Sequence, residues 1–100
     1  MAFPQQTPRP YTRRDIEKLT VGQRGCYGIV RKNNDGSWTW IYVGKGDDIR
    51  ARMLEHVNGD NPRITRKRPT HWVGMVTNDN DDEEKRLILA LNPVANRKVG

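Results

Sequence analysis

The sequence of 100 residues contains one cysteine, one phenylalanine and no long apolar run. The single Cys26 excludes an internal disulfide and a CxxC pair for zinc or redox chemistry, which is compatible with a reducing compartment. A membrane-spanning helix needs about 18 consecutive apolar residues, and the first ten residues lack the apolar core of a signal peptide. We therefore expect a soluble, intracellular protein of the cytoplasm, or of the nucleoid or nucleus.

Positive charge is in excess, with 18 lysines and arginines against 12 acidic residues and a net charge of +6. This balance favours a polyanionic partner, nucleic acid before an anionic membrane. A hydrophobic fraction of 34% with 30% charged residues is typical of a globular chain, and this length suffices for one small domain. Charge alone leaves open that the protein is basic without binding nucleic acid.

The chain divides into three predicted parts. Residues 1–11 are rich in Pro and Gln without a hydrophobic period, which predicts a flexible, basic arm. Residues 12–24 are predicted to hold a short helix, with Thr12 as a possible N-cap, and a lead-in. Residues 25–100 form the main domain. It begins with two β-rich runs around the turn sequence NNDG, a predicted hairpin with a loop of about five residues.

After the hairpin, Asp47 or Asp48 can cap a helix that runs to about Val57. The run THWVGMVT predicts a third strand, and a last helix is expected to end at the dipeptide NP. In the second strand of the hairpin, simple alternation places Trp38, Trp40 and Tyr42 on the same side. The predicted order is helix, strand, strand, helix, strand, helix.

One acidic residue, Glu84, lies on the apolar face of the last predicted helix. At 100° per residue, Leu87, Ile88 and Leu91 define the face that packs inward, and Glu84 falls on it. The helix dipole favours acids in a first turn, whereas a carboxylate that faces a sheet needs a partner or a metal. The spacing alone leaves both interpretations open.

The helix after the glycine turn presents Arg52 and His56 four residues apart on one side, at the border of its apolar stripe. A solvated helix edge is one interpretation and a functional pair is the other. The glycines themselves do not form a P-loop, because GxxxxGK[ST] is absent from the segment YVGKGDD.

Taken in order, these residues resemble the GIY-YIG nuclease superfamily. Gly25-Cys26-Tyr27 corresponds to the first tripeptide, with Cys for Ile, and Tyr42-Val43-Gly44 to the second, with Val for Ile. Arg52, His56, Glu84 and Asn96 follow at compatible distances, and the resemblance covers about residues 25–96. It implies an α+β fold with a small three-stranded, mainly antiparallel sheet flanked by helices.

The resemblance also implies roles for the matched residues. Glu84 would hold one divalent cation, Mg²⁺ or Mn²⁺, which keeps waters and takes substrate oxygens as ligands. Arg52 would stabilise the phosphate in the transition state. Tyr27 would activate the attacking water if the nearby positive charge of Arg52 and the metal favours its phenolate. Tyr42 would orient water or phosphate, and His56 would bind phosphate or shuttle a proton.

The basic run RITRKRP can supply contacts to a nucleic-acid backbone, with a solvated basic loop as the alternative. The residues expected to bind nucleic acid are Lys45, Arg63, Arg66, Lys67, Arg68 and Asn96. Asn96 could instead bond to backbone, and Lys45 could be a solvated surface lysine. The three tryptophans are expected in the core.

These observations predict a metal-dependent endonuclease that hydrolyses DNA, with RNA not excluded and no membrane partner. The alternative is a nucleic-acid-binding module that has the same fold and no catalysis. A third possibility is a basic protein that binds only other proteins. A single domain leaves no room for a targeting module, so we expect weak specificity, selectivity for DNA structure, or dependence on a homodimer or a targeting partner protein.

Overall fold

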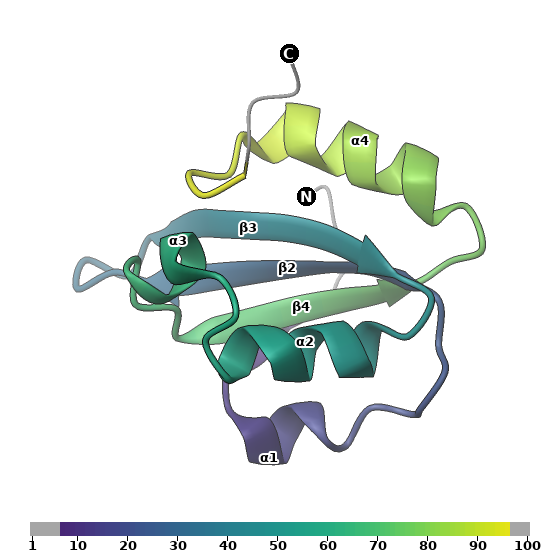
Figure 1. Cartoon of the computed structure of the whole chain (residues 1–100). Coiled ribbons are helices and arrows are strands. Elements are labelled where there is room, and N and C mark those ends of the chain that lie inside the picture. The colour runs from purple at the N-terminus through teal and green to yellow at the C-terminus, as the bar shows by residue number, and fades with distance from the viewer. Residues whose placement is uncertain (1–6, 97–100) are drawn as a thin grey trace.

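The β-sheet in the computed structural model, which describes residues 7–96, has four antiparallel strands in the order β1-β4-β2-β3 (Figure 1). The strands are β1 (Arg9–Pro10), β2 (Gly25–Lys32), β3 (Trp38–Gly46) and β4 (His71–Val76). Strand β2 pairs with both β3 and β4, so it lies at the centre, and β3 forms one edge.

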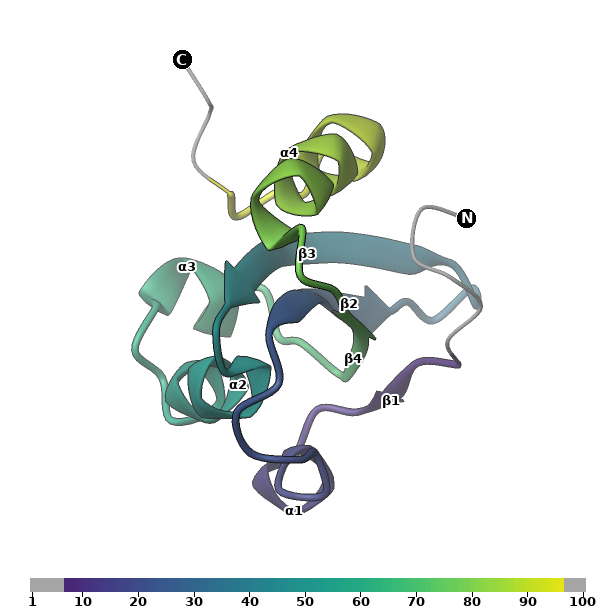
Figure 2. The same ribbon diagram turned by 90° about the vertical axis from the view of Figure 1, so that its right-hand side faces the viewer.

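Helices cover both faces of this sheet (Figure 2). Helices α1 (Arg13–Ile16) and α2 (Ile49–Val57) lie on one face, and α4 (Asn80–Leu91) lies on the other. The short α3 (Pro62–Thr65) lies beside the edge strand β3. Between residues 7 and 96, no helix is both long and apolar enough to cross a lipid bilayer.

The α+β class is confirmed, but the prediction of three strands is wrong, because β1 adds a fourth. Arg9 and Pro10, in the segment expected to be a flexible arm, pair with Trp72 and His71 of β4. Asp15 holds this strand in place, since it contacts Arg9 at 3.0 Å and accepts a hydrogen bond from Nε1 of Trp72 at 3.1 Å. Two residues, one of them proline, show no strand periodicity in the sequence. Residues 1–6 of the predicted arm lie outside the part that the structure describes.

The helix caps follow the predicted chemistry. Thr12 caps α1 and Asp48 caps α2, each by accepting a hydrogen bond from the backbone N–H three residues later. Helix α3 was not expected within the basic run. It is one turn long, it is capped by Asn61 with Pro62 in its first turn, and it buries Ile64.

A β-bulge in β3 overturns the simple alternation expected for this strand. The hairpin loop, residues 33–37, has the expected five residues. In the ladder, however, Tyr42 lies opposite Ile29 and Trp40 lies opposite Val30, so Ile41 has no partner. One extra residue turns the following side chains to the other face. Tyr42 therefore packs with the α2-side core, while Trp40 packs under α4.

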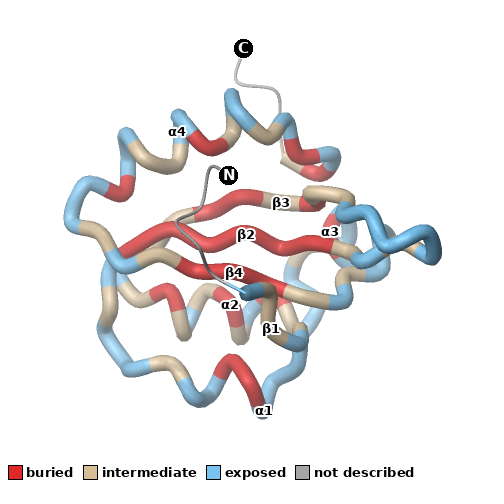
Figure 3. Tube along the Cα trace, turned by 180° about the vertical axis from the view of Figure 1, so that it is seen from behind, coloured by how far each residue is buried: buried red, intermediate tan, exposed pale blue. Residues whose placement is uncertain are grey.

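The core consists of two layers, one on each face of the sheet, and the buried backbone follows the three long strands (Figure 3). Below the sheet, Ile49 and Met53 of α2 pack against Ile29 and Ile41. Above it, Leu87 of α4 packs on the opposite sheet face. Trp72 is buried as expected, whereas Trp38 is 39% exposed at the start of β3 and does not belong to the core.

Two motif glycines are required by close packing across the sheet. A Cβ at Gly44 would overlap the ring and hydroxyl of Tyr27, which lies directly opposite on β2. A Cβ at Gly25 would overlap the backbone carbonyl of Met75 on β4. The glycine of each tripeptide is therefore a packing constraint: Gly44 leaves room for the Tyr27 ring, and Gly25 for the backbone of β4.

We predict that Gly44→Ala lowers the free energy of unfolding by about 1–3 kcal/mol, the usual cost of overpacking. Urea denaturation followed by tryptophan fluorescence measures the change. Gly74→Ala is the matched control in the same sheet. Its Cβ would lie 3.1 Å from a ring carbon of Trp72, so the Trp72 ring needs to move only slightly to accept it. Equal losses for the two variants would contradict the packing argument.

Candidate active site

A cleft of about 610 Å³ opens along the edge strand β3, between α2 and α3 on one side and α4 on the other. It brings together most of the residues that the sequence singled out. The predicted site residues that line it are Tyr42, Arg52, His56, Arg63, Arg66, Glu84 and Asn96. Tyr27 is not on the cleft surface, because it is fully buried behind Arg52 and His56.

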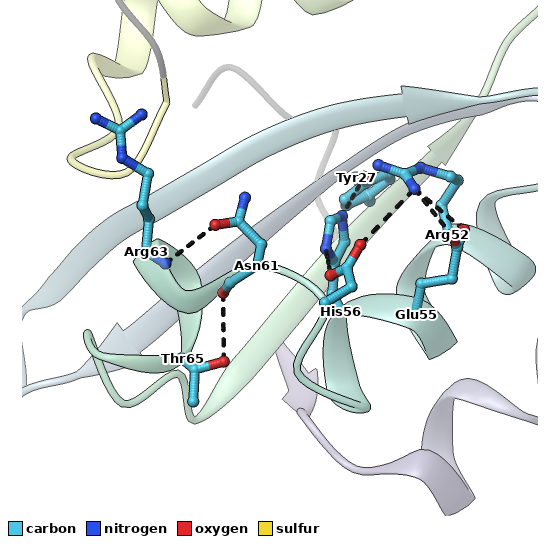
Figure 4. A network of polar contacts seen from close by, with 8 residues as sticks. Tyr27, Arg52, Glu55, His56, Asn61, Arg63 and Thr65 are labelled. Atoms are coloured by element: carbon cyan, nitrogen blue, oxygen red, sulfur yellow. Dashed lines mark hydrogen bonds and ion pairs between the residues drawn. The ribbon is translucent and has the colours of Figure 1, made fainter.

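Two buried side chains, Tyr27 and His56, and the exposed Asp60 at the cleft form a chain of hydrogen bonds. The hydroxyl of Tyr27 lies 2.7 Å from Nε2 of His56, and Nδ1 of His56 lies 2.8 Å from Oδ1 of Asp60 (Figure 4). An ionised carboxylate only accepts hydrogen bonds, so Nδ1 carries the imidazole proton and Nε2 accepts from the Tyr27 hydroxyl. The three groups are therefore ordered for proton movement from Tyr27 towards Asp60.

The end of α2 brings Asp60 to His56. The helix ends at Val57 with Asn58 as C-cap, and Gly59 adopts a φ of +90°, which favours glycine. The chain reverses there, and the N–H of Asp60 bonds back to the carbonyl of Glu55 at 3.2 Å. His56 itself is only 3% exposed, which excludes the interpretation of a solvated helix edge for this residue.

Burial is the largest influence on the pKa values of His56 and Tyr27. Burial lowers the pKa of His56 below its usual 6.5, although Asp60 acts in the opposite direction, so His56 is neutral at neutral pH. Burial also raises the pKa of Tyr27, with Tyr42 adding to the shift, while Arg52 opposes it. Arg52 thus acts in the predicted direction, but burial outweighs it and Tyr27 stays protonated.

Arg52 bridges the buried chain and the cleft. Its Nη1 donates to both carboxylate oxygens of Glu55, at 3.0 and 3.1 Å, and lies 3.9 Å from Oδ2 of Asp60. Its guanidinium also lies near Tyr27, where it acts to lower the pKa of the hydroxyl. Arg50, by contrast, reaches the backbone carbonyl of Glu17. From this helix, Arg52 rather than Arg50 supplies the cation of the cleft.

Glu84 faces Arg52 from the opposite wall, on α4. Its half-buried carboxylate makes no hydrogen bond or ion pair with any other residue of the described chain, whereas the neighbouring Asp81 and Glu83 contact Lys45 and Arg86. Burial raises the pKa of Glu84, with Asp81 adding to the shift and Lys45 and Lys85 opposing it. A carboxylate left in this state is stabilised by a cation.

These properties fit a divalent cation. Residues 7–96 contain no cluster of three or more histidine, cysteine or acidic side chains that could hold a metal by themselves. Mg²⁺ needs no such cage, because it keeps several waters and takes one or two carboxylates together with substrate oxygens. Glu84 is the residue that would hold it.

Two residues expected to bind nucleic acid have partners within the protein. Lys45 contacts the carboxylate of Asp81 at the α4 end of the site. Asn96 uses both amide groups on the edge strand, since it accepts from the N–H of Val43 and donates to its carbonyl, each at 2.8 Å. Binding of nucleic acid by these two residues stays a prediction.

Sequence reasoning missed two carboxylates of the site, Glu55 and Asp60. Asp60 could have been found, because it follows His56 by four residues and stands directly after a turn glycine, a spacing that returns a carboxylate to the histidine. Glu55 gives no such signal, since an acid three residues after an arginine on a helix is common on solvated surfaces.

Comparison with known proteins supports the fold. No family model and no curated protein matches the sequence. Among solved structures, the chain is similar to the GIY-YIG N-terminal endonuclease domain of UvrC from Thermotoga maritima bound to its catalytic divalent cation, magnesium. The TM-score is 0.65 at 20% identity, over 85% of this chain and 96% of that chain. A point mutant of the same domain, also bound to its catalytic divalent cation, gives a TM-score of 0.64 at 23% identity, over 86% and 94% of the two chains. The chain has the fold of the GIY-YIG endonuclease domains.

We predict that the His56 ring titrates below pH 6.5 and that Asp60→Asn lowers its pKa further, because a charge that favours the imidazolium is removed. The unfolded chain takes up this proton near 6.5, so the stability that neutral His56 contributes above that pH is lost as the pH falls below it. An NMR titration of the ring carbon signals measures both pKa values. Glu17→Gln, which removes a distant exposed acid, should leave the titration unchanged, and an unshifted pKa in Asp60→Asn would contradict the hydrogen-bond chain.

Proposed function

We propose that this chain, which has the fold of the GIY-YIG endonuclease domains, is a metal-dependent endonuclease that hydrolyses phosphodiester bonds of DNA. The observation that carries the proposal is one cleft with the carboxylate of Glu84, which has no partner among the described residues, on one wall and the guanidinium of Arg52 on the other. The UvrC domain of the same fold is described as an endonuclease bound to its catalytic divalent cation.

Glu84 would hold the divalent cation, Mg²⁺ or Mn²⁺, which would supply Lewis-acid polarisation of the scissile phosphate. Arg52 binds the non-bridging phosphate oxygens from the facing wall. In the free protein the same guanidinium lies on Glu55. A substrate phosphate therefore competes with Glu55 for Arg52, and the turn of Arg52 towards the phosphate uncovers the Tyr27 hydroxyl.

Tyr27 and His56 act together as the base. Tyr27 takes a proton from the attacking water as its own proton passes to Nε2 of His56, and Asp60 stabilises the resulting imidazolium through Nδ1–H. No tyrosinate accumulates, which suits a phenol whose pKa is raised by burial. Tyr42 lies on the cleft with its ring centroid 5.3 Å from that of His56, where it orients water or phosphate.

DNA is the expected polyanion because the cleft continues into a basic surface. Arg63 and Arg66 line the cleft itself and Lys67 lines a hollow next to it. These residues neutralise backbone phosphates without reading bases. A homodimer or a targeting partner would supply the selectivity that one small domain lacks.

We predict that Glu84→Ala lowers the rate of plasmid cleavage in Mg²⁺ or Mn²⁺ by at least about 100-fold, the scale of losing one transition-state electrostatic contact. DNA binding should survive, and EDTA should abolish cleavage by the parent. Glu83→Ala is the matched control, since its carboxylate lies one position away and pairs with Arg86.

If Glu84→Ala cuts as fast as the parent, the assignment of the metal site is wrong. A parent that binds DNA but cuts no substrate with either metal would instead support a binding module without catalysis. Branched and single-stranded DNA and RNA belong in the same assay, because preference for any of them changes the substrate class.

We further predict that Asp60→Asn lowers kcat about 10- to 100-fold, the contribution typical of general base catalysis, with KM nearly unchanged. The acid limb of the pH–rate profile should also move to lower pH, because the pKa of His56 falls when the charge of Asp60 is removed. A purely structural role would lower the rate without moving the limb. Asp35→Asn, in the hairpin loop where Asp35 bonds to Ser37, controls for the loss of one carboxylate.

A further inference from the structure

Charge is distributed unequally along the cleft. At its α4 end, acids crowd the start of the helix, and the pKa of Asp79 is raised, chiefly by Asp82. Three cations at this end already have carboxylate partners: Arg24 with Asp47, Lys45 with Asp81 and Arg86 with Glu83. Lys85 of α4 has none between residues 7 and 96, and apart from it phosphate oxygens at this end would meet negative or neutralised groups.

At the opposite end, six cations follow one another from the cleft to the β2–β3 hairpin. They are Arg63, Arg66, Lys67, Arg68, Arg31 and Lys32. None of the six forms an ion pair with a carboxylate between residues 7 and 96. The carboxylates of Asp81 and Glu83 pair with other cations, Lys45 and Arg86. Asp35 borders the hairpin hollow, but it accepts its hydrogen bonds from Ser37.

Shared residues make these cations one continuous track. Arg63 and Arg66 line both the cleft and a second hollow of about 230 Å³, which also includes Lys67. The carbonyl of Lys67 accepts a hydrogen bond from Nη1 of Arg31 at 2.8 Å. Arg31 then lines a third hollow, of about 550 Å³, with Lys32 and Arg68. The β2–β3 hairpin loop, which begins directly after Arg31 and Lys32, projects beyond the sheet on the side of α3 (Figure 1).

We propose that duplex DNA is held along this track, on one side of the cleaved bond only, with Arg31 and Lys32 as the contacts farthest from Glu84. The proposal rests on the proposed function, since Glu84 marks the scissile phosphate. Six unpaired cations neutralise phosphates on the track, whereas the crowded acids at the α4 end repel them. The protein thus binds the duplex on one side of the scissile phosphate and makes no contact with the duplex on the other side.

The chemistry of the track favours a duplex over a single strand. Single strands are held by aromatic side chains on which bases stack, and the three hollows of the track are lined by no aromatic residue other than Tyr42 of the cleft. Trp38 lies nearby, but it already packs edge-to-face with His71 and beneath Lys32. The longest dimension of the Cα trace is 34 Å, which limits the gripped flank to about ten base pairs at about 3.4 Å each.

Binding of a labelled 20-base-pair duplex to the EDTA-treated protein tests the track without cleavage. Fluorescence anisotropy between 50 and 200 mM salt should show a Kd at least about tenfold weaker for Arg31→Gln/Lys32→Gln than for the parent. The slope of log K against log salt should fall by about two, because each lost phosphate contact removes about 0.9. Lys32→Gln alone, which keeps the Arg31 bond to Lys67, should lower the slope by about one.

Arg50→Gln/Lys85→Gln is the matched control. It also removes two positive charges that lack carboxylate partners in the described chain, but both lie off the track. Its Kd should stay within about twofold of the parent. If the control loses as much affinity as the hairpin variant, only net charge matters and the track is wrong. Unchanged binding by the hairpin variant, or a slope change seen only with duplex RNA, also overturns the proposal.

Cleavage tests the one-sided grip. In a duplex with a single ordinary phosphodiester among phosphorothioate linkages, the flank on either side can be shortened from 12 to 3 base pairs. We expect shortening of one flank to lower kcat/KM about tenfold and shortening of the other to change it little. Equal effects would overturn the one-sided grip, and absence of cleavage with every substrate would overturn the proposed function while the anisotropy result still decides the track.

Discussion

The buried hydroxyl of Tyr27 is the constraint on which the site depends, because a buried hydroxyl without a partner costs free energy. His56 provides the acceptor, which requires a neutral ring with its proton on Nδ1. Asp60 fixes that proton, and Gly59 allows the turn that brings Asp60 back. On the opposite strand, only a glycine at position 44 leaves room for the ring. One side chain thus links two strands, a helix end and a loop.

Short-range signals made much of the fold predictable. The turn sequence, the caps at Thr12 and Asp48 and the apolar stripe of α2 give the hairpin and its helices. The fourth strand was not predictable, since Arg9 and Pro10 pair with Trp72 and His71 of β4, which are distant in sequence. The bulge at Ile41 was missed for a similar reason: Val and Ile fit either face of a strand, so periodicity does not show a slip of one residue.

The sequence pointed to several residues of the candidate site but not to their connections. Arg52, His56 and Glu84 line one cleft, whereas Tyr27 is buried behind it and Asp60 was missed. Spacing does not reveal that burial outweighs Arg52 at Tyr27, because burial depends on how both helix α2 and strand β3 cover the ring. The two walls of the cleft are therefore electrically different. On one wall Arg52 is neutralised by acids, and on the other Glu84 has no counter-ion in contact among residues 7–96.

The segment after α4 protects the open edge of the sheet. The N–H groups of Val94 and Ala95 bond to the carbonyls of Trp40 and Ile41, and the side-chain amide of Asn96 pairs with both backbone groups of Val43. Together they imitate a neighbouring strand along β3. An uncovered edge strand would invite strand addition by another chain, and with it amyloid-like aggregation. This fold can therefore keep an open cleft beside an edge strand while the hydrogen-bonding groups in the middle of that edge are already occupied.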